Sequence, residues 1–126
     1  MNKPKILVAE DDLVSQKLLH YFLEDYQLDY VKNSRDAIRK IKQESYSCVL
    51  VDIALENNDD GLDIPKFIKS TPAVKSIPVI ATTAHAFTHD RDRSLEAGCD
   101  AFLTKPIMKE KLLQTVQSYV GQATPA

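Results

Sequence analysis

Short, continuously apolar runs alternate along this chain with longer segments in which apolar residues recur at helical spacing. A strand that is covered on both faces needs apolar side chains on both, so such runs predict buried strands. The runs lie at residues 6–9 (ILVA), 48–52 (CVLVD), 78–82 (PVIAT) and 101–103 (AFL). A weaker, partly alternating run at residues 28–31 predicts one further strand.

Helical periodicity fills the intervals between these strands. Apolar spacing of three and four residues predicts helices over about residues 13–25, from the turn at 33–34 to about 44, and over 62–70, 88–97 and 109–120. The expected core positions are Val14, Leu18, Leu19, Phe22 and Leu23 in the first helix, and Leu112, Leu113, Val116, Tyr119 and Val120 in the last. Asp12 is placed to cap the first helix, and Gly98 to end the fourth.

Five strands that alternate with five helices through short connections predict an α/β fold. We expect a doubly wound (βα)5 arrangement of three layers, in which helices cover both faces of a parallel five-stranded sheet. The 126 residues suit a single domain, with a core over about residues 5–120 and a tail at 121–126.

Composition narrows the classes of function. The net charge of −2 gives no basic surface for nucleic acid. No apolar run approaches the roughly 20 residues of a membrane span, and no signal peptide precedes the first strand, so we expect a cytoplasmic protein without membrane contact. Cys48 and Cys99 lack the spacing of a metal or redox motif and are expected to be reduced, buried or half-buried thiols.

Polar side chains follow the carboxyl ends of four predicted strands. In chain order they are Glu10, Asp11 and Asp12 after the first strand, Asp52 at the end of the third, Thr83 after the fourth and Lys105 after the fifth. The carboxyl ends of parallel strands share one edge, where α/β folds bind their ligands. We therefore expect these groups to lie together.

This combination of groups has a specific chemistry. Clustered carboxylates repel one another unless a cation offsets them, and oxygen ligands without a neighbouring histidine or thiolate favour Mg²⁺ or Mn²⁺. A threonine hydroxyl and a lysine ammonium can bind phosphoryl oxygens. Each group has a plainer reading by itself, as a turn, helix-start or surface residue. Together they suit the formation of an aspartyl phosphate.

Four segments resemble the receiver domain of bacterial two-component response regulators. They are residues 6–11 (ILVAED), 51–53 (VDI), 78–84 (PVIATTA) and 98–106 (GCDAFLTKP), and the resemblance covers about residues 5–120. It implies a flavodoxin-like fold with strand order 2-1-3-4-5, in a single domain like that of the chemotaxis regulator.

The resemblance also implies roles for individual residues. Asp52 matches the phosphoacceptor, Glu10 and Asp11 match the acidic pair that positions Mg²⁺, and Asp12 is a further candidate ligand. The backbone carbonyl of Ala54 matches a main-chain metal ligand.

The remaining matches concern the switch. Thr83 matches the switch hydroxyl, Phe102 the switch aromatic residue and Lys105 the phosphate-binding lysine. The Lys105–Pro106 peptide bond is implied to be cis. By the same resemblance, the rate of phosphate hydrolysis depends on Ala54 and His85.

A receiver of this kind acts as a switch and has no separate substrate. It takes its phosphoryl group from a histidine kinase or a histidine phosphotransfer protein. It then signals to a downstream protein through the surface of its fourth helix, fifth strand and fifth helix. One segment departs from the family pattern, because Glu56 stands where a proline is common and the loop to Gly61 is one residue longer.

Three alternatives stay open. The sequence also suits a receiver excised from a hybrid histidine kinase or a multidomain response regulator. An aspartyl-phosphate hydrolase is less favoured, because Ala54 stands where such enzymes have a second aspartate. A flavodoxin-like cofactor carrier is disfavoured as well, since the acidic residues after the first strand would repel its phosphate.

Overall fold

The computed structural model describes residues 3–55, 57, 59–84 and 88–120. Within them, five parallel strands form a sheet in the order β2-β1-β3-β4-β5, which confirms the predicted doubly wound fold. The strands are β1 (Lys5–Ala9), β2 (Gln27–Val31), β3 (Cys48–Asp52), β4 (Val79–Thr83) and β5 (Ala101–Thr104). The helices are α1 (Leu13–Phe22), α2 (Ser34–Gln43), α3 (Asp63–Ser70), α4 (Thr88–Glu96) and α5 (Lys109–Val120). The expected tail at 121–126 lies outside the described residues.

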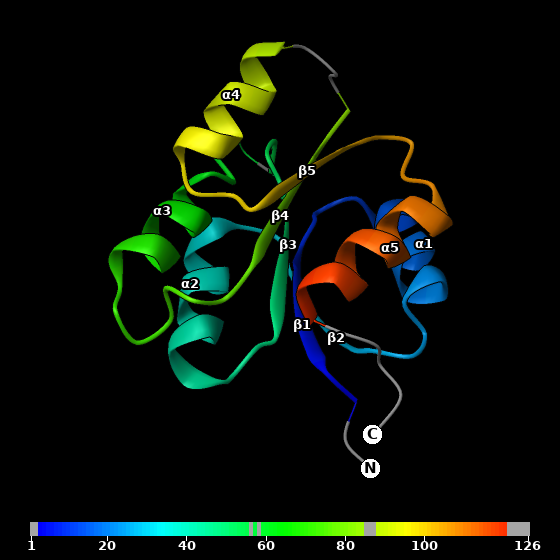
Figure 1. Cartoon of the computed structure of the whole chain (residues 1–126), viewed down its shortest axis with the longest axis horizontal. Helices are drawn as coiled ribbons and strands as arrows, with labels where there is room; N and C mark the ends of the chain where they lie inside the picture. The colour runs from blue at the N-terminus through cyan, green and yellow to red at the C-terminus, as the bar shows by residue number, and fades with distance from the viewer. Residues whose placement is uncertain (1–2, 56, 58, 85–87, 121–126) are drawn as a thin grey trace.

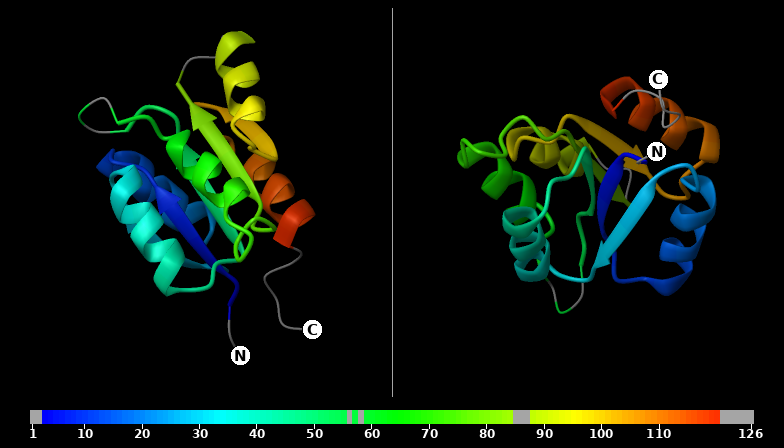
Figure 2. Two further views of the ribbon diagram at one scale, coloured as in Figure 1. Left: turned by 90° about the vertical axis from the view of Figure 1, so that its left-hand side faces the viewer. Right: turned by 90° about the horizontal axis from the view of Figure 1, so that it is seen from below.

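The helices divide between the two faces of the sheet. Figure 1 shows α1 and α5 on one face and α2 and α3 on the other, with α4 beside β5, and the two views in Figure 2 show the same three layers. Successive side chains of each strand point to opposite faces, so each central strand feeds two apolar clusters. In β3, Val49 and Val51 pack with α2 and α3, whereas Cys48 and Leu50 pack with α1 and α5.

The ends of α1 and β4 differ from the prediction because tertiary contacts set them. α1 ends at Phe22, three residues early, where the fully buried Leu23 leaves helical geometry and its N–H donates to the Leu19 carbonyl. β4 continues through Thr83, which was expected in the following loop. Thr83 pairs with Thr104 on β5, and its carbonyl accepts the Lys105 N–H at 2.7 Å.

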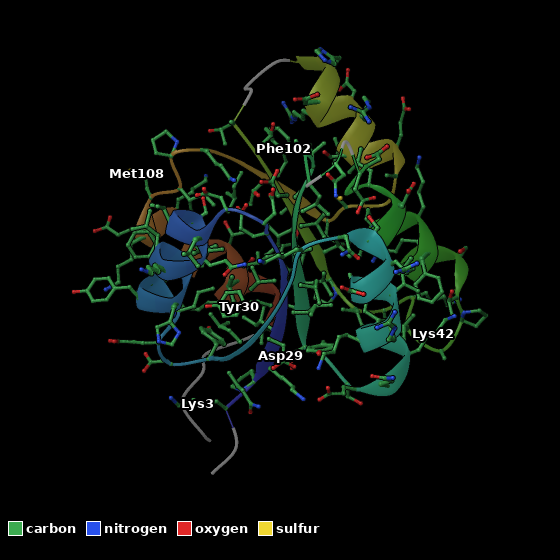
Figure 3. The ribbon with its side chains drawn as sticks, turned by 180° about the vertical axis from the view of Figure 1, so that it is seen from behind. Lys3, Asp29, Tyr30, Lys42, Phe102 and Met108 are labelled. Carbon is green, nitrogen blue, oxygen red and sulfur yellow. The ribbon has the colours of Figure 1, made fainter. Side chains whose placement is uncertain are left out.

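The predicted core faces of α1 and α5 are partly wrong. Val14 and Leu18 are 66% and 48% exposed, because α1 presents only a narrow stripe with Leu19 to the sheet. Tyr119 on α5 is 44% exposed, and its hydroxyl donates to the Asp100 carbonyl at 2.8 Å. Met108, just before α5, projects from the edge of the molecule and is 67% exposed (Figure 3).

The two cysteines are free and buried, as predicted. Burial raises the pKa of Cys48 and of Cys99 to about 12. Because the thiolate is the reactive form, neither thiol is a nucleophile near neutral pH. In the described part of the chain, no helix has the length and apolar character that crossing a membrane requires.

Candidate functional site

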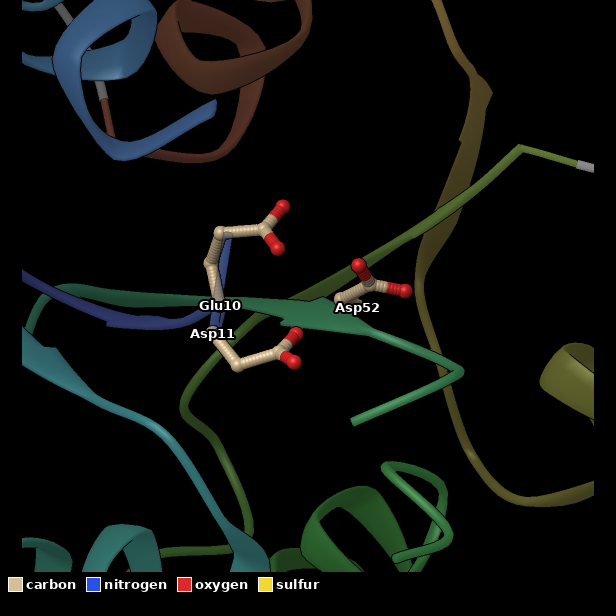
Figure 4. Close-up of side chains that lie close together, drawn as sticks. All are labelled: Glu10, Asp11 and Asp52. Carbon is tan, nitrogen blue, oxygen red and sulfur yellow. The ribbon is translucent and has the colours of Figure 1, made fainter. Parts of the chain in front are cut away.

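Three carboxylates meet at the carboxyl edge of the sheet. Glu10 and Asp11 follow β1, and Asp52 ends β3, which is the neighbouring strand. One carboxylate oxygen from each lies within 4.8 Å of the other two, and Figure 4 shows the three side chains around one space. Glu10 is only 2% exposed and Asp52 only 7%. The parallel topology therefore concentrates negative charge at a nearly buried point.

Lys105 supplies the cation that offsets this charge. Its Nζ donates to Oε1 of Glu10 at 2.7 Å and to Oδ2 of Asp52 at 2.8 Å. Burial by itself would lower the pKa of Lys105, but the hydrogen bonds to the two carboxylates outweigh it and the pKa is raised. Burial also raises the pKa of Glu10, although the bond from Lys105 acts in the opposite direction. One ammonium thus holds two carboxylates.

The backbone after β3 fixes the Asp52 side chain. The Ala54 N–H donates to Oδ1 of Asp52 at 2.9 Å, while the Ile53 N–H donates to the Thr82 carbonyl at 3.0 Å. With Lys105 on Oδ2, both oxygens of Asp52 have a defined partner. The carboxylate is therefore oriented by two groups, one from the β3–α3 loop and one that follows β5.

Asp12 caps a helix, unlike its acidic neighbours Glu10 and Asp11. Its Oδ2 accepts hydrogen bonds from the N–H and the hydroxyl of Ser15, each at 2.9 Å, so Asp12 caps α1 as predicted. These bonds lower the pKa of Asp12. Asp12 is not part of the carboxylate group formed by Glu10, Asp11 and Asp52.

The predicted switch residues lie on β4 and β5, the strands that follow Asp52 in the sheet. Thr83, at the end of β4, is 3% exposed, and its hydroxyl donates to Oδ2 of Asp90 on α4 at 3.2 Å. Phe102 on β5 is half-buried and packs against the apolar cluster on the α2 and α3 side. The Lys105–Pro106 peptide bond is cis.

The loop between β3 and α3 closes on itself and against α2. The Leu55 N–H donates to the Asp59 carbonyl at 3.2 Å, and Asp60 pairs with Ala54 in an isolated bridge. The Asp59 side chain accepts the N–H of Ser34 at the start of α2. Glu56, the predicted point of departure from the family, lies outside the described residues.

Sequence reasoning missed Asp90 and Arg93 as neighbours of the site. The only local signal was an acidic and a basic residue three positions apart on a weakly amphipathic helix. That pattern is typical of a solvated helix face. Nothing in it indicated that Asp90 would be buried against β4.

Gly61 allows the loop to pass close to the end of β3, and this leads to a prediction. A Cβ at Gly61 would lie 2.0 Å from the Asp52 carbonyl oxygen. Because that obstacle is backbone, Gly61→Ala is expected to lower the free energy of unfolding by about 3 kcal/mol or more. Denaturant unfolding measures this loss.

Gly98→Ala provides the comparison. Gly98 has a φ of +104°, and its Cβ would meet Cγ of Lys69 at 2.5 Å, which is part of a flexible side chain. The expected loss is smaller, about 1–2 kcal/mol from the unfavourable backbone conformation. A Gly61→Ala protein as stable as the wild type would contradict the close approach.

Comparisons with known proteins agree with this geometry. The sequence model of the response regulator receiver domain matches residues 6–117. The chain is 31% identical over 120 residues to the polar-differentiation response regulator DivK of Brucella anthropi, covering 94% of this chain and 97% of that protein.

Two solved structures extend the comparison to metals. One is the receiver domain of the sensor histidine kinase PA1611 from Pseudomonas aeruginosa PAO1, with a magnesium ion coordinated in its active-site cleft. It is 28% identical, covers 97% of this chain and 100% of its own, and superposes with a TM-score of 0.86. The other is the Mn²⁺-bound form of response regulator Rcp1, which is 25% identical with a TM-score of 0.77 over 98% of this chain and 99% of its own.

Proposed function

This chain belongs to the family of response regulator receiver domains, and from that premise we propose that Asp52 is its phosphoacceptor in a histidine-to-aspartate phosphorelay. One observation carries the proposal. The Asp52 carboxylate is nearly buried at the end of β3, held by Lys105 and the Ala54 N–H, with two further carboxylates beside it. A carboxylate with a purely structural role would need a cation beside it, whereas further carboxylates beside it would only add repulsion.

The residues of the site divide the chemistry between them. A carboxylate oxygen of Asp52 attacks the phosphorus of a phosphohistidine, so that an O–P bond forms while the P–N bond breaks and the imidazole leaves with the electron pair. The ammonium of Lys105 and the hydroxyl of Thr83 bind the oxygens of the transferred group. The donor is a histidine kinase or a histidine phosphotransfer protein.

A divalent cation, Mg²⁺ or Mn²⁺, suits the donor set. Glu10, Asp11, Asp52 and the Ala54 carbonyl would hold it, and hard oxygen ligands of this kind are those that both ions prefer. When bound, the cation offsets the repulsion between the carboxylate and an anionic phosphoryl group. The fit rests on the three clustered carboxylates, of which Glu10 and Asp52 share the ammonium of Lys105.

Output follows from Thr83 and Phe102. When Thr83 moves toward the phosphoryl group, it vacates space that Phe102 can enter, and the surface of α4, β5 and α5 changes with it. That surface binds a downstream protein, and the chain does not bind nucleic acid directly. Hydrolysis of the aspartyl phosphate resets the switch, and the small Ala54 leaves room for water. His85, the other position expected to set the rate, lies outside the described residues.

Acetyl phosphate tests the proposal without a partner protein. With Mg²⁺, the wild-type chain is expected to gain the mass of one phosphoryl group, stable in acid and lost in base, as measured by intact mass spectrometry. Chelating the divalent cation is expected to prevent the gain. No uptake, uptake without a divalent cation, or an acid-labile product would each overturn the proposal.

A further inference from the structure

Asp90 is a buried carboxylate that stands apart from the acidic cluster. It lies in the first turn of α4, and its side chain is 11% exposed. Its Oδ2 accepts the hydrogen bond from the Thr83 hydroxyl. A hydrogen bond to an ionised acceptor is stronger than one between neutral groups.

Other contacts hold Asp90 in place. Its Oδ1 lies 3.7 Å from Nη1 of Arg93 and 3.4 Å from Nε2 of His89, while its backbone carbonyl accepts the Ser94 hydroxyl at 2.8 Å. The other guanidinium nitrogen of Arg93 lies 3.4 Å from Oδ2 of Asp60 in the β3–α3 loop. The carboxylate is therefore anchored independently of Thr83.

These groups surround one hollow next to the acceptor. Thr83, Asp90, Arg93 and Asp60 line it together with Ala54, whose N–H holds the Asp52 carboxylate. A threonine hydroxyl carries a single proton. It can donate that proton to Asp90 or to a phosphoryl group on Asp52, but not to both.

We propose that Asp90 is a positioning residue that holds the Thr83 hydroxyl in the unphosphorylated state. On phosphorylation, the hydroxyl must give up its hydrogen bond to Asp90 before it can donate to the phosphoryl group on Asp52. The proposal rests on Asp52 being the phosphoacceptor. Its consequence is that the first turn of α4 loses a bond to β4 when the phosphoryl group arrives, while Asp90 keeps its ion pair with Arg93. The cost of breaking the bond opposes activation.

Beryllofluoride, a mimic of the phosphoryl group, measures this cost as an affinity. Asp90→Ala removes the competing acceptor, so the protein with Mg²⁺ is expected to bind beryllofluoride about tenfold more tightly than the wild type. Asp90→Asn keeps a neutral acceptor and is expected to lie between the two. Isothermal titration gives the constants, and circular dichroism shows whether each variant is folded. If Asp90→Ala does not fold, Asp90→Asn is used for the test instead, and its affinity for beryllofluoride is expected to be about threefold higher than that of the wild type.

Two controls separate the hydrogen bond from general electrostatics. Asp92→Ala removes the same charge from an exposed position on the same helix and is expected to leave the affinity within about twofold. In a Thr83→Ala background, Asp90→Ala is expected to have no effect, because the two residues act through one bond. An equal gain in that background, or no gain in the wild-type background, would overturn the role of Asp90. A wild type that binds no beryllofluoride would instead overturn the proposed function.

Discussion

Replacing Asp52 with asparagine is expected to abolish phosphate uptake from acetyl phosphate. A carboxamide oxygen is a far weaker nucleophile than a carboxylate, and an amide does not form a stable acyl phosphate here. Asparagine keeps the shape of the side chain and one acceptor oxygen, which can take the place of the oxygen bound by the Ala54 N–H or of the one bound by the Lys105 ammonium. The loss should therefore occur in a folded protein, with intact mass and thermal unfolding as the two measurements.

Asp63→Asn is the matched control for this substitution. Asp63 is exposed in the first turn of α3, so the same change of chemistry is made just beyond the β3–α3 loop. It is expected to take up phosphate at the wild-type rate. Uptake by Asp52→Asn at that rate would show that another residue is the acceptor.

Replacing Lys105 with methionine is expected to have two effects of different origin. Phosphorylation should slow by about 100-fold, the usual effect of removing one group that binds developing negative charge. In metal-free buffer the free energy of unfolding should also fall, by about 3–5 kcal/mol, because Glu10 and Asp52 are then buried together without their shared cation. Stopped reactions give the rate, and denaturant unfolding gives the stability.

Mg²⁺ distinguishes these two effects. A ligand that binds only the folded state stabilises it, and a divalent cation can replace the missing ammonium charge. Added Mg²⁺ is therefore expected to restore part of the stability of Lys105→Met but not its rate. Lys111→Met, an exposed change on α5, is expected to alter neither. An unchanged stability of Lys105→Met without metal would contradict the charge balance between these three residues.

Much of the fold could be predicted because the spacing of apolar residues along the chain depends on which faces of each strand or helix are buried. Strands covered on both faces, such as β3, are apolar throughout, and parallel strands must bring their ends to one edge. That rule alone indicated that Glu10, Asp52 and Lys105 would meet, and they do. The position of Thr83 within β4 depends on its pairing with β5, which no local pattern contains.

The remaining differences also arise from contacts between distant elements. Val14 has the spacing of a core residue, but spacing does not say how wide a stripe of α1 the sheet covers. Gly61 reads as an ordinary turn glycine, and its need for close approach becomes visible only beside the Asp52 carbonyl. Asp90 reads as a surface acid until its helix is placed against Thr83.

The charge balance at the sheet edge also makes the site depend on residues that are synthesised far apart in time. Glu10 and Lys105 are 95 positions apart in the sequence, and Asp52 lies between them. During synthesis the acidic residues emerge long before the lysine that neutralises them. A nascent or truncated chain without β5 would hold Asp52 beside Glu10 and Asp11 without the ammonium of Lys105. Under the proposed function, competence to receive a phosphoryl group is thus acquired only when β5 joins the sheet and brings Lys105 to Asp52.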